Sequence, residues 1–244
     1  MCGIAGMVQT HPDGEVEQAT VHRMCEAMVH RGPDDEGIFV KAGVGLGMRR
    51  LSIIDLAGGH QPVFNEDKTI WIVFNGEIYN FPELRTQLQA CGHRFSTHTD
   101  TEVIAHLYEE HGAECVHKLR GMFAFALYDE RAGRLLLARD RVGKKPLHYA
   151  LQNGTLLFAS EMKAILAVRP ELAELNNPAL LQYMYSDIFQ TRRRHSSRFR
   201  SCLRDTCWNS RRESCAFVST GIFPRMGPMS PGAKKSCCKN SNFA

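Results

Sequence analysis

The strongest constraint on the fold of this 244-residue chain is a pair of neighbouring hairpin patterns in residues 121–160. FAFALYDERAGRLLLARD predicts two strands joined by a turn at Glu130–Gly133. LHYALQNGTLLFAS contains Asn153-Gly154, a dipeptide typical of two-residue turns between antiparallel strands. Antiparallel strands close in sequence and flanked by helical segments indicate an α+β domain built of separate layers.

The residues before these hairpins alternate between strand and helix patterns. GIAGMVQ and IWIVFNGEI predict strands. We expect the second strand to be buried, because it is rich in β-branched and aromatic residues. EVEQATVHRMCEAMVHR, FPELRTQLQACG and DTEVIAHLYEEHG predict helices, with Asp100 placed to cap the third. SEMKAILAV and NPALLQYMY predict two further helices, the second starting near Asn177 and Pro178.

The charge balance changes abruptly after residue 190. Residues 1–190 carry 18 Lys and Arg against 24 Asp and Glu, whereas residues 191–244 carry 12 against 2. The second segment also holds nine serines and five of the nine cysteines, with no periodic apolar pattern. We therefore predict a folded domain over residues 2–190 and an unfolded basic tail over residues 191–244.

Several classes of protein are excluded by pattern. No apolar run approaches the roughly 20 residues that a membrane span needs, and the start is not a secretory signal, so we expect a cytoplasmic protein. The cysteines form no CxxC pair with metal-like spacing and are expected to be reduced thiols. The histidines form no HxxxH pair, and we therefore predict no metal site.

Cys2 is the first candidate for chemistry. If Met1 is removed, one residue carries both a thiol and a free α-amine. An α-amine titrates at about 7.7–8.0 and can therefore accept the proton of a thiol near neutral pH. Many proteins begin with Met-Cys without such a role, so the position alone leaves both interpretations open.

Three other features are candidates for catalysis or substrate binding if Cys2 is a nucleophile. Asn75-Gly76 ends the predicted strand and could supply oxyanion donors, although Asn-Gly also forms simple turns. Arg50 could grip a carboxylate, although solvated surface arginines are commoner. Asp100 could bind a cation or only cap its helix.

Eight segments in this order resemble the glutamine amidotransferase domain of glutamine-hydrolysing asparagine synthetases. The resemblance covers roughly residues 2–190 and implies an N-terminal-nucleophile hydrolase fold, a four-layer αββα sandwich. RLSIIDLAGGHQPV and NGEIYNFPELR are similar to asparagine synthetases in particular. The eight segments are MCGIAG, HRGPDDEG, RLSIIDLAGGHQPV, FNGEIYN, HTDTEVI, GMFAFALYD, RDRVGKKPLHY and FASEMKAIL.

The resemblance implies hydrolysis of L-glutamine to glutamate and ammonia through a γ-glutamyl thioester. It assigns the catalytic roles to Cys2 as nucleophile and to Asn75 and Gly76 as oxyanion donors. The remaining implied residues bind the glutamine substrate. They are Arg50 for its α-carboxylate, Leu51, Ser52, Ile53 and Ile54 for backbone contacts, and Glu77 and Asp100 for its α-ammonium group.

The sequence departs from the family pattern in its tail. Full-length asparagine synthetases continue into an ATP- and Mg²⁺-dependent domain with an SGG-x-DS loop, which this sequence lacks. We therefore expect glutaminase activity only, no cofactor for the domain present, no nucleic-acid partner and a homodimer as in the family. The abrupt change suggests a tail read in a shifted frame. The alternatives are a catalytically silent truncated fragment and a nucleic-acid-binding protein that uses the basic tail.

Overall fold

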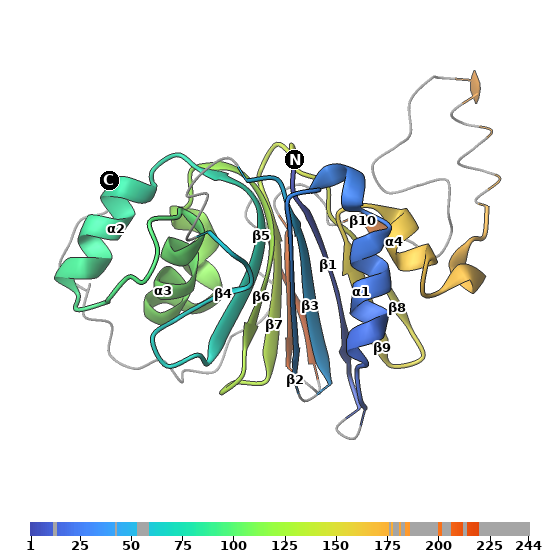
Figure 1. Ribbon diagram of the computed structural model, residues 1–244, viewed down its shortest axis with the longest axis horizontal. Helices are drawn as coiled ribbons and strands as arrows, with labels where there is room; N and C mark the ends of the chain where they lie inside the picture. The colour runs from blue at the N-terminus through green and yellow to red at the C-terminus, as the bar shows by residue number, and fades with distance from the viewer. Residues whose placement is uncertain are drawn as a thin grey trace.

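Two stacked β-sheets with helices on their outer faces form the centre of the computed structural model (Figure 1). The order of layers is helix, sheet, sheet, helix, so the prediction of an αββα sandwich is confirmed. The structure describes residues 1–11, 14–41, 43–52, 59–175, 177, 181, 184–185, 200–201, 206–211 and 214–219.

The first sheet contains the start of the chain. Its strand β1 lies between β3 and β9 and is antiparallel to both, with Gly3 opposite Arg49 and Ala5 opposite Ala159. In spatial order the strands are β10 (Arg200–Ser201), β8 (His148–Gln152), β9 (Thr155–Ala159), β1 (Gly3–Gln9), β3 (Val44–Arg50) and β2 (Asp35–Lys41).

The second sheet is built around its longest antiparallel pair. Strand β5 pairs with β6 along its full length, from Ile70 opposite Asp129 to Ile78 opposite Gly121. In spatial order the strands are β12 (Ser214–Ser219), β11 (Thr206–Arg211), β7 (Arg134–Arg139), β6 (Gly121–Asp129), β5 (Ile70–Ile78) and β4 (Val63–Phe64).

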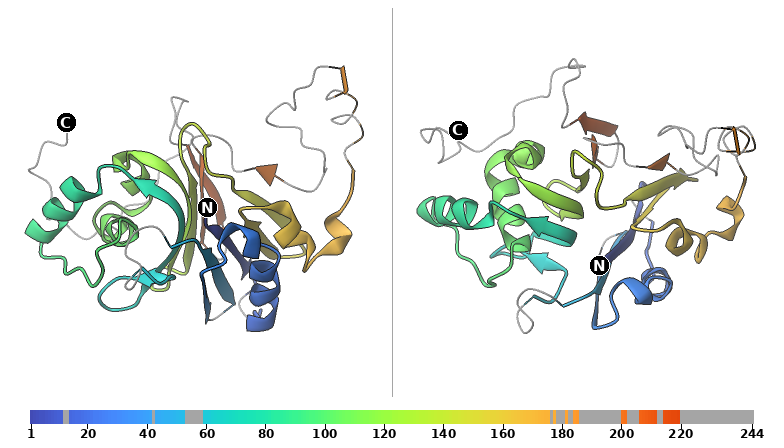
Figure 2. Two further views of the ribbon diagram at one scale, coloured as in Figure 1. Left: turned by 45° about the horizontal axis from the view of Figure 1, so that its top comes forward. Right: turned by 90° about the horizontal axis from the view of Figure 1, so that it is seen from above.

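Helices cover the outer face of each sheet. Helices α1 (Gln18–Glu26) and α4 (Met162–Leu166) cover the first sheet, whereas α2 (Phe81–Ala90) and α3 (Thr101–His111) cover the second, as the views in Figure 2 also show. Three short 3₁₀ helices complete the described elements. They are η1 (Val29–Arg31), η2 (Gly112–Lys118) and η3 (Pro170–Leu172).

Three apolar clusters hold the four layers together. The central one lies between the sheets and includes Ile4, Leu46, Val73 and Phe158. A second joins α1 and α4 to the first sheet, and a third joins α2 and α3 to the second sheet. Side chains alternate between the two faces of a strand, so each strand serves the central cluster and one outer cluster.

The local predictions of strands and helices are confirmed. β1 and β5 have the bounds of GIAGMVQ and IWIVFNGEI, and α2 and α3 lie inside the predicted helical segments. The turn between β8 and β9 has positive φ at both Asn153 and Gly154, as the Asn-Gly pattern predicts. The closing helix NPALLQYMY lies largely outside the described residues.

Short strands are described within parts of the tail. β10 pairs with β8, β11 pairs with β7, and β12 pairs with β11, so parts of residues 200–219 extend both sheets. Edge strands present unpaired backbone groups that accept another strand whatever its side chains. This pairing therefore does not require an amphipathic pattern in the added strand.

No helix among the described segments has the length and apolar character required to span a lipid bilayer.

The central cluster generates a first prediction. Leu46 on β3 is fully buried between the sheets, whereas Leu151 on β8 is 56% exposed. Leu46→Ala should lower the free energy of unfolding by about 2–5 kcal/mol, because it removes buried apolar contacts and leaves a cavity. Urea unfolding of both variants measures the difference. Leu151→Ala is the matched control and should change the free energy far less; equal losses would contradict this account of the core.

Candidate active site at the start of the chain

Cys2 lies on the inner side of the first sheet. Ile4 on β1 belongs to the central cluster, and Cys2, two residues earlier, packs against the same cluster. Two-residue periodicity therefore directs the Cys2 side chain towards the second sheet rather than towards α1. Met1 is 59% exposed, so the chain begins at the surface, and it enters the first sheet at Gly3.

The thiol of Cys2 contacts the backbone at the end of β3. The Leu51 N–H donates a hydrogen bond to Cys2 Sγ at 3.5 Å, and Sγ lies 3.7 Å from the Leu51 carbonyl oxygen. These contacts follow from the antiparallel pairing of Gly3 with Arg49, which brings the start of β1 to the end of β3. The predicted nucleophile and the predicted substrate-binding segment are therefore neighbours.

Arg50 ends β3 and is buried. It is 6% exposed, and alternation places it on the same face of β3 as Leu46 and Met48, both members of the central cluster. Arg49 lies on the opposite face, where it donates hydrogen bonds to the Gly32 carbonyl and to Glu36. The interpretation of Arg50 as a solvated surface arginine is therefore wrong.

Asn75 on β5 presents a buried amide to the same interior. It is 1% exposed and lies on the face of β5 that carries Val73 into the central cluster. Within the described part of the chain, Asn75 Nδ2 makes no hydrogen bond. Because burying an unpaired amide costs free energy, this nitrogen is available for a ligand that enters between the sheets.

Gly76 is required by the packing of β5 against β6. A Cβ atom at this position would lie 2.2 Å from the Met122 carbonyl oxygen and 2.7 Å from Phe123 Cα. Both are backbone atoms of the partner strand, so a side chain would separate the two strands beside Asn75. The Asn75-Gly76 pair lies within an extended strand, and the simple-turn interpretation is wrong.

Asp100 precedes α3, and its carboxylate is hydrogen-bonded to the end of β5. Asp100 Oδ2 accepts a hydrogen bond from the Ile78 N–H at 2.8 Å, and the side chain makes no cap hydrogen bond. The prediction of an N-cap is therefore correct in position and wrong in contact. Burial raises the pKa of Asp100, and the charge of Glu77 raises it further. A cation between these two carboxylates would relieve that repulsion.

The other predicted binding residues follow Arg50. The Ser52 N–H donates to Asp34 Oδ2 at 2.8 Å, which ties this segment to the loop before β2. Ile53 and Ile54 lie outside the described residues.

Strand order and direction bring these groups to one end of the sandwich. β1 begins at this end, β3 ends there beside it, and the chain leaves β5 there on its way to α2 (Figures 1 and 2). The groups brought to this end are the Cys2 thiol, the buried Arg50 guanidinium, the Asn75 amide and the carboxylates of Glu77 and Asp100. The three strands β1, β3 and β5 are not consecutive along the chain.

Comparisons with known proteins identify the family to which the chain belongs. A sequence model of the glutamine amidotransferase domain matches residues 1–212. The chain belongs to the glutamine amidotransferase domain family. The match extends beyond residue 190 and includes the tail strands β10 and β11.

The amidotransferase domain is similar to the N-terminal part of asparagine synthetases. It is 45% identical over 186 residues to glutamine-hydrolysing asparagine synthetase 1 of Bacillus subtilis, covering 75% of this chain and 29% of that protein. It is 44% identical over 166 residues to the Sandersonia aurantiaca asparagine synthetase, covering 68% and 31%. The chain therefore spans about a third of the length of these relatives.

The fold of the amidotransferase domain also occurs in solved structures. The B. subtilis glutamine phosphoribosylpyrophosphate amidotransferase aligns with a TM-score of 0.68 and 19% sequence identity, covering 91% of this chain and 50% of that protein. This likeness confirms the sandwich architecture.

Arg31 is a residue of the site that sequence reasoning missed. Its Nε donates to the Cys2 carbonyl oxygen at 3.0 Å, and its Nη1 contacts Glu161 Oε1 at 2.9 Å. The guanidinium thereby joins the first residues of the domain to the start of α4. Arg31 belongs to the HRGPDDEG segment, and its contact with Cys2 depends on the fold.

The other cysteines of the amidotransferase domain have different environments. Cys25 and Cys115 are buried free thiols, and burial raises both pKa values, that of Cys25 to about 12. A raised pKa disfavours the reactive thiolate at both positions. Cys91 is only half-buried at the end of α2 and is disulfide-bonded, so the prediction of a reduced thiol is wrong there.

The Arg31–Glu161 contact should make the stability of the domain depend on pH. Partial burial opposes ionisation of Glu161, but hydrogen bonds from Arg31, His30 and Lys163 outweigh it and lower its pKa to about 2. Since the folded pKa lies below the ordinary value of 4.5, the carboxylate stabilises the fold above about pH 4.5 and ceases to do so as the pH falls towards 2.

Glu161→Gln should therefore destabilise the domain at neutral pH, and its deficit should shrink between about pH 4.5 and pH 2. Urea unfolding across this range measures the deficit. Glu83→Gln, an exposed carboxylate change on α2, is the control. A deficit for Glu161→Gln that does not depend on pH would contradict the prediction.

Proposed function

We propose that the chain hydrolyses the side-chain amide of L-glutamine, with Cys2 as nucleophile after removal of Met1. The observation that carries this proposal is the buried, unpaired Asn75 amide on the face towards which Cys2 also points. Free glutamine has one negative, one positive and one neutral amide group. Arg50, the Glu77–Asp100 pair and the Cys2–Asn75 region match these three groups in charge and chemistry.

Each end of the substrate has a suited partner. The buried guanidinium of Arg50 binds the α-carboxylate through paired charge-assisted hydrogen bonds. The α-ammonium group lies against Glu77 and Asp100, where it lowers the electrostatic cost of two nearby carboxylates. These two contacts orient the substrate so that its carboxamide faces Cys2.

The reaction proceeds through a thioester. The Cys2 α-amine accepts the thiol proton, and sulfur attacks the carboxamide carbon to form a tetrahedral intermediate. Asn75 Nδ2 and the Gly76 N–H stabilise its oxyanion. The C–N bond breaks as the amine returns the proton to nitrogen, releasing ammonia and leaving a γ-glutamyl thioester. Water then attacks the thioester, which yields glutamate and restores the thiol.

The use of the ammonia follows from the relatives. Proteins named as glutamine-hydrolysing asparagine synthetases share this domain at their N-terminal end. The ammonia would serve a synthetase domain that uses ATP with Mg²⁺, and those groups would be held there, since the SGG-x-DS loop is not in this sequence.

The proposed nucleophile is tested by substitution. Cys2→Ala should abolish release of glutamate and ammonia, because no other group can form the thioester. Cys25→Ala, which changes a buried thiol elsewhere, should retain activity. Protein that keeps Met1, identified by mass spectrometry, should also be inactive because its α-amine is blocked. Full activity of either the Cys2→Ala form or the Met1 form would overturn the assignment.

The oxyanion role predicts a change in kcat. Asn75→Ala should lower kcat by about 10²–10³-fold with little change in KM, because its amide contacts charge that develops only in the transition state. Steady-state glutamine hydrolysis measures both constants. A rise in KM with kcat unchanged would assign Asn75 to ground-state binding instead.

The substrate-binding role predicts a change in KM. Arg50→Lys keeps the charge but loses the paired hydrogen bonds, so KM for glutamine should rise about 10- to 100-fold. Arg49→Lys is a matched control, because Arg49 is the neighbouring residue on the opposite face of β3. Similar KM values for the two variants would remove Arg50 from the binding site.

A further inference from the structure

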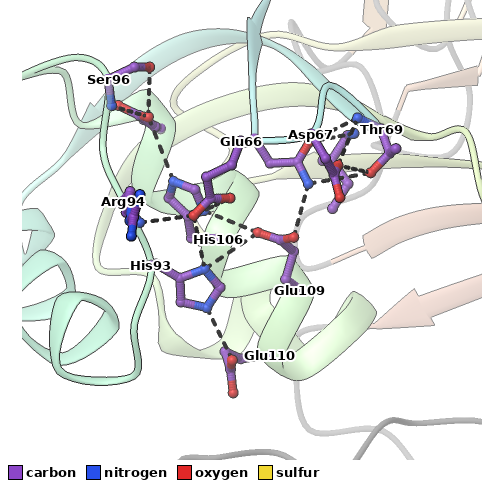
Figure 3. A network of polar contacts seen from close by, with 12 residues as sticks. Glu66, Asp67, Thr69, His93, Arg94, Ser96, His106, Glu109 and Glu110 are labelled. Carbon is purple, nitrogen blue, oxygen red and sulfur yellow. Dashed lines mark hydrogen bonds and ion pairs between the residues drawn. The ribbon is translucent and has the colours of Figure 1, made fainter.

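A second cluster of polar side chains lies on the helical side of the second sheet, away from Cys2. It brings together Glu66 from the β4–β5 turn, His93 from the segment after α2, and His106 and Glu109 from α3 (Figure 3). The four ligand-type atoms, one from each side chain, all lie within 4.8 Å of one another. We call these residues the His–Glu cluster.

The inward atoms of the cluster have the spacing of a metal coordination shell. His106 Nδ1 lies 3.1 Å from Glu109 Oε2 and 3.5 Å from Glu66 Oε2. His93 Nδ1 lies 3.6 Å from Glu109 Oε2 and 3.7 Å from Glu66 Oε1. In a tetrahedral zinc site with bonds of 2.0–2.1 Å, neighbouring ligand atoms are about 3.3 Å apart. Only small shifts separate this arrangement from such a site.

The outward nitrogens of both histidines face further carboxylates. His93 Nε2 is hydrogen-bonded to Glu110 Oε1 at 3.1 Å. His106 Nε2 faces Glu102 Oε1 at 3.6 Å and makes no hydrogen bond within the described residues. An Nε2–H directed at a carboxylate leaves the Nδ1 lone pair free for the centre of the cluster. Metal-binding histidines are oriented in this way in known sites, with the second ring nitrogen donating to an outer acceptor.

The two carboxylate ligands are also oriented. The Arg94 N–H donates to Glu66 Oε1 at 2.9 Å, and Asn65 Nδ2 donates to Glu109 Oε1 at 2.9 Å. Each contact leaves at least one carboxylate oxygen directed at the histidines. Glu66 is 38% exposed, which provides a route for an ion from solvent.

The local charge favours a cation at the centre. Four carboxylates surround the two imidazole rings of His93 and His106. A divalent cation at the centre would be balanced by this negative charge.

We propose that Glu66, His93, His106 and Glu109 form a structural Zn²⁺ site. Two imidazole nitrogens and two carboxylate oxygens suit Zn²⁺ in tetrahedral geometry. The ion joins the turn before β5 and the segment after α2 to the body of α3, the helix that Asp100 precedes. HxxxH spacing could not reveal the site, because His93 and His106 meet only through the fold.

The test uses the full chain, freed of metal with a chelator and dialysed. Isothermal titration with Zn²⁺ should show one site per chain, and the bound ion should raise Tm. Glu66→Gln and His93→Ala should each weaken binding at least 100-fold. Glu110→Gln, which removes only an outer acceptor, should weaken it about 10- to 100-fold. His22→Ala, on α1 beyond the other sheet, is the matched histidine control and should bind as the wild type does.

Substitution with Co²⁺ identifies the donors. The protein should show the intense visible absorption of tetrahedral Co²⁺ without the near-ultraviolet band of a cobalt–thiolate bond, and Glu66→Gln should reduce it. Circular dichroism checks that each variant is folded. Zn²⁺ binding that is unchanged in the Glu66→Gln and His93→Ala proteins, a thiolate band, or no binding by the folded wild type would overturn the proposal.

Discussion

The apolar contact between the two sheets is the constraint on which the site depends. Ile4, Leu46 and Val73 come from three different strands and meet in the central cluster. Because side chains alternate along a strand, the packing that buries these residues also decides which way their neighbours point. Cys2, Arg50 and Asn75 are an even number of residues away, so they reach the same interior near its end.

A one-residue slip in any of these strands would turn its functional residue to the outer face. Arg49 illustrates the difference, since it is adjacent to Arg50 and instead contacts Glu36 outside the central layer. Gly76 protects the register in another way, because its missing side chain lets β5 approach the backbone of β6. The chemistry of the site and the packing of the sandwich are therefore parts of one arrangement.

The end of the sandwich holds polar groups that a purely apolar interface would exclude. Arg50, Asn75 and Asp100 are all nearly inaccessible, and the amide of Asn75 is without a hydrogen bond in the described structure. The unpaired Nδ2 atom of Asn75 lowers stability unless a ligand completes it. Functional sites commonly carry a stability cost of this kind.

The amino-acid sequence by itself determined the local elements and, through its motifs, the family. Residue patterns predicted the bounds of β5 and the Asn153-Gly154 turn because propensity and periodicity act over a few residues. The motifs also singled out Cys2 and Arg50 from the sequence alone.

Tertiary structure alone decided the contacts between distant segments. Arg31 donates a hydrogen bond to the Cys2 carbonyl, 29 residues away. Asp100 accepts one from the Ile78 N–H, 22 residues away, and the His93 ring contacts the His106 ring, 13 residues away. The tail strands likewise depend on open sheet edges rather than on their own pattern. None of these leaves a periodic signal, because each depends on how whole layers pack rather than on the preferences of neighbouring residues.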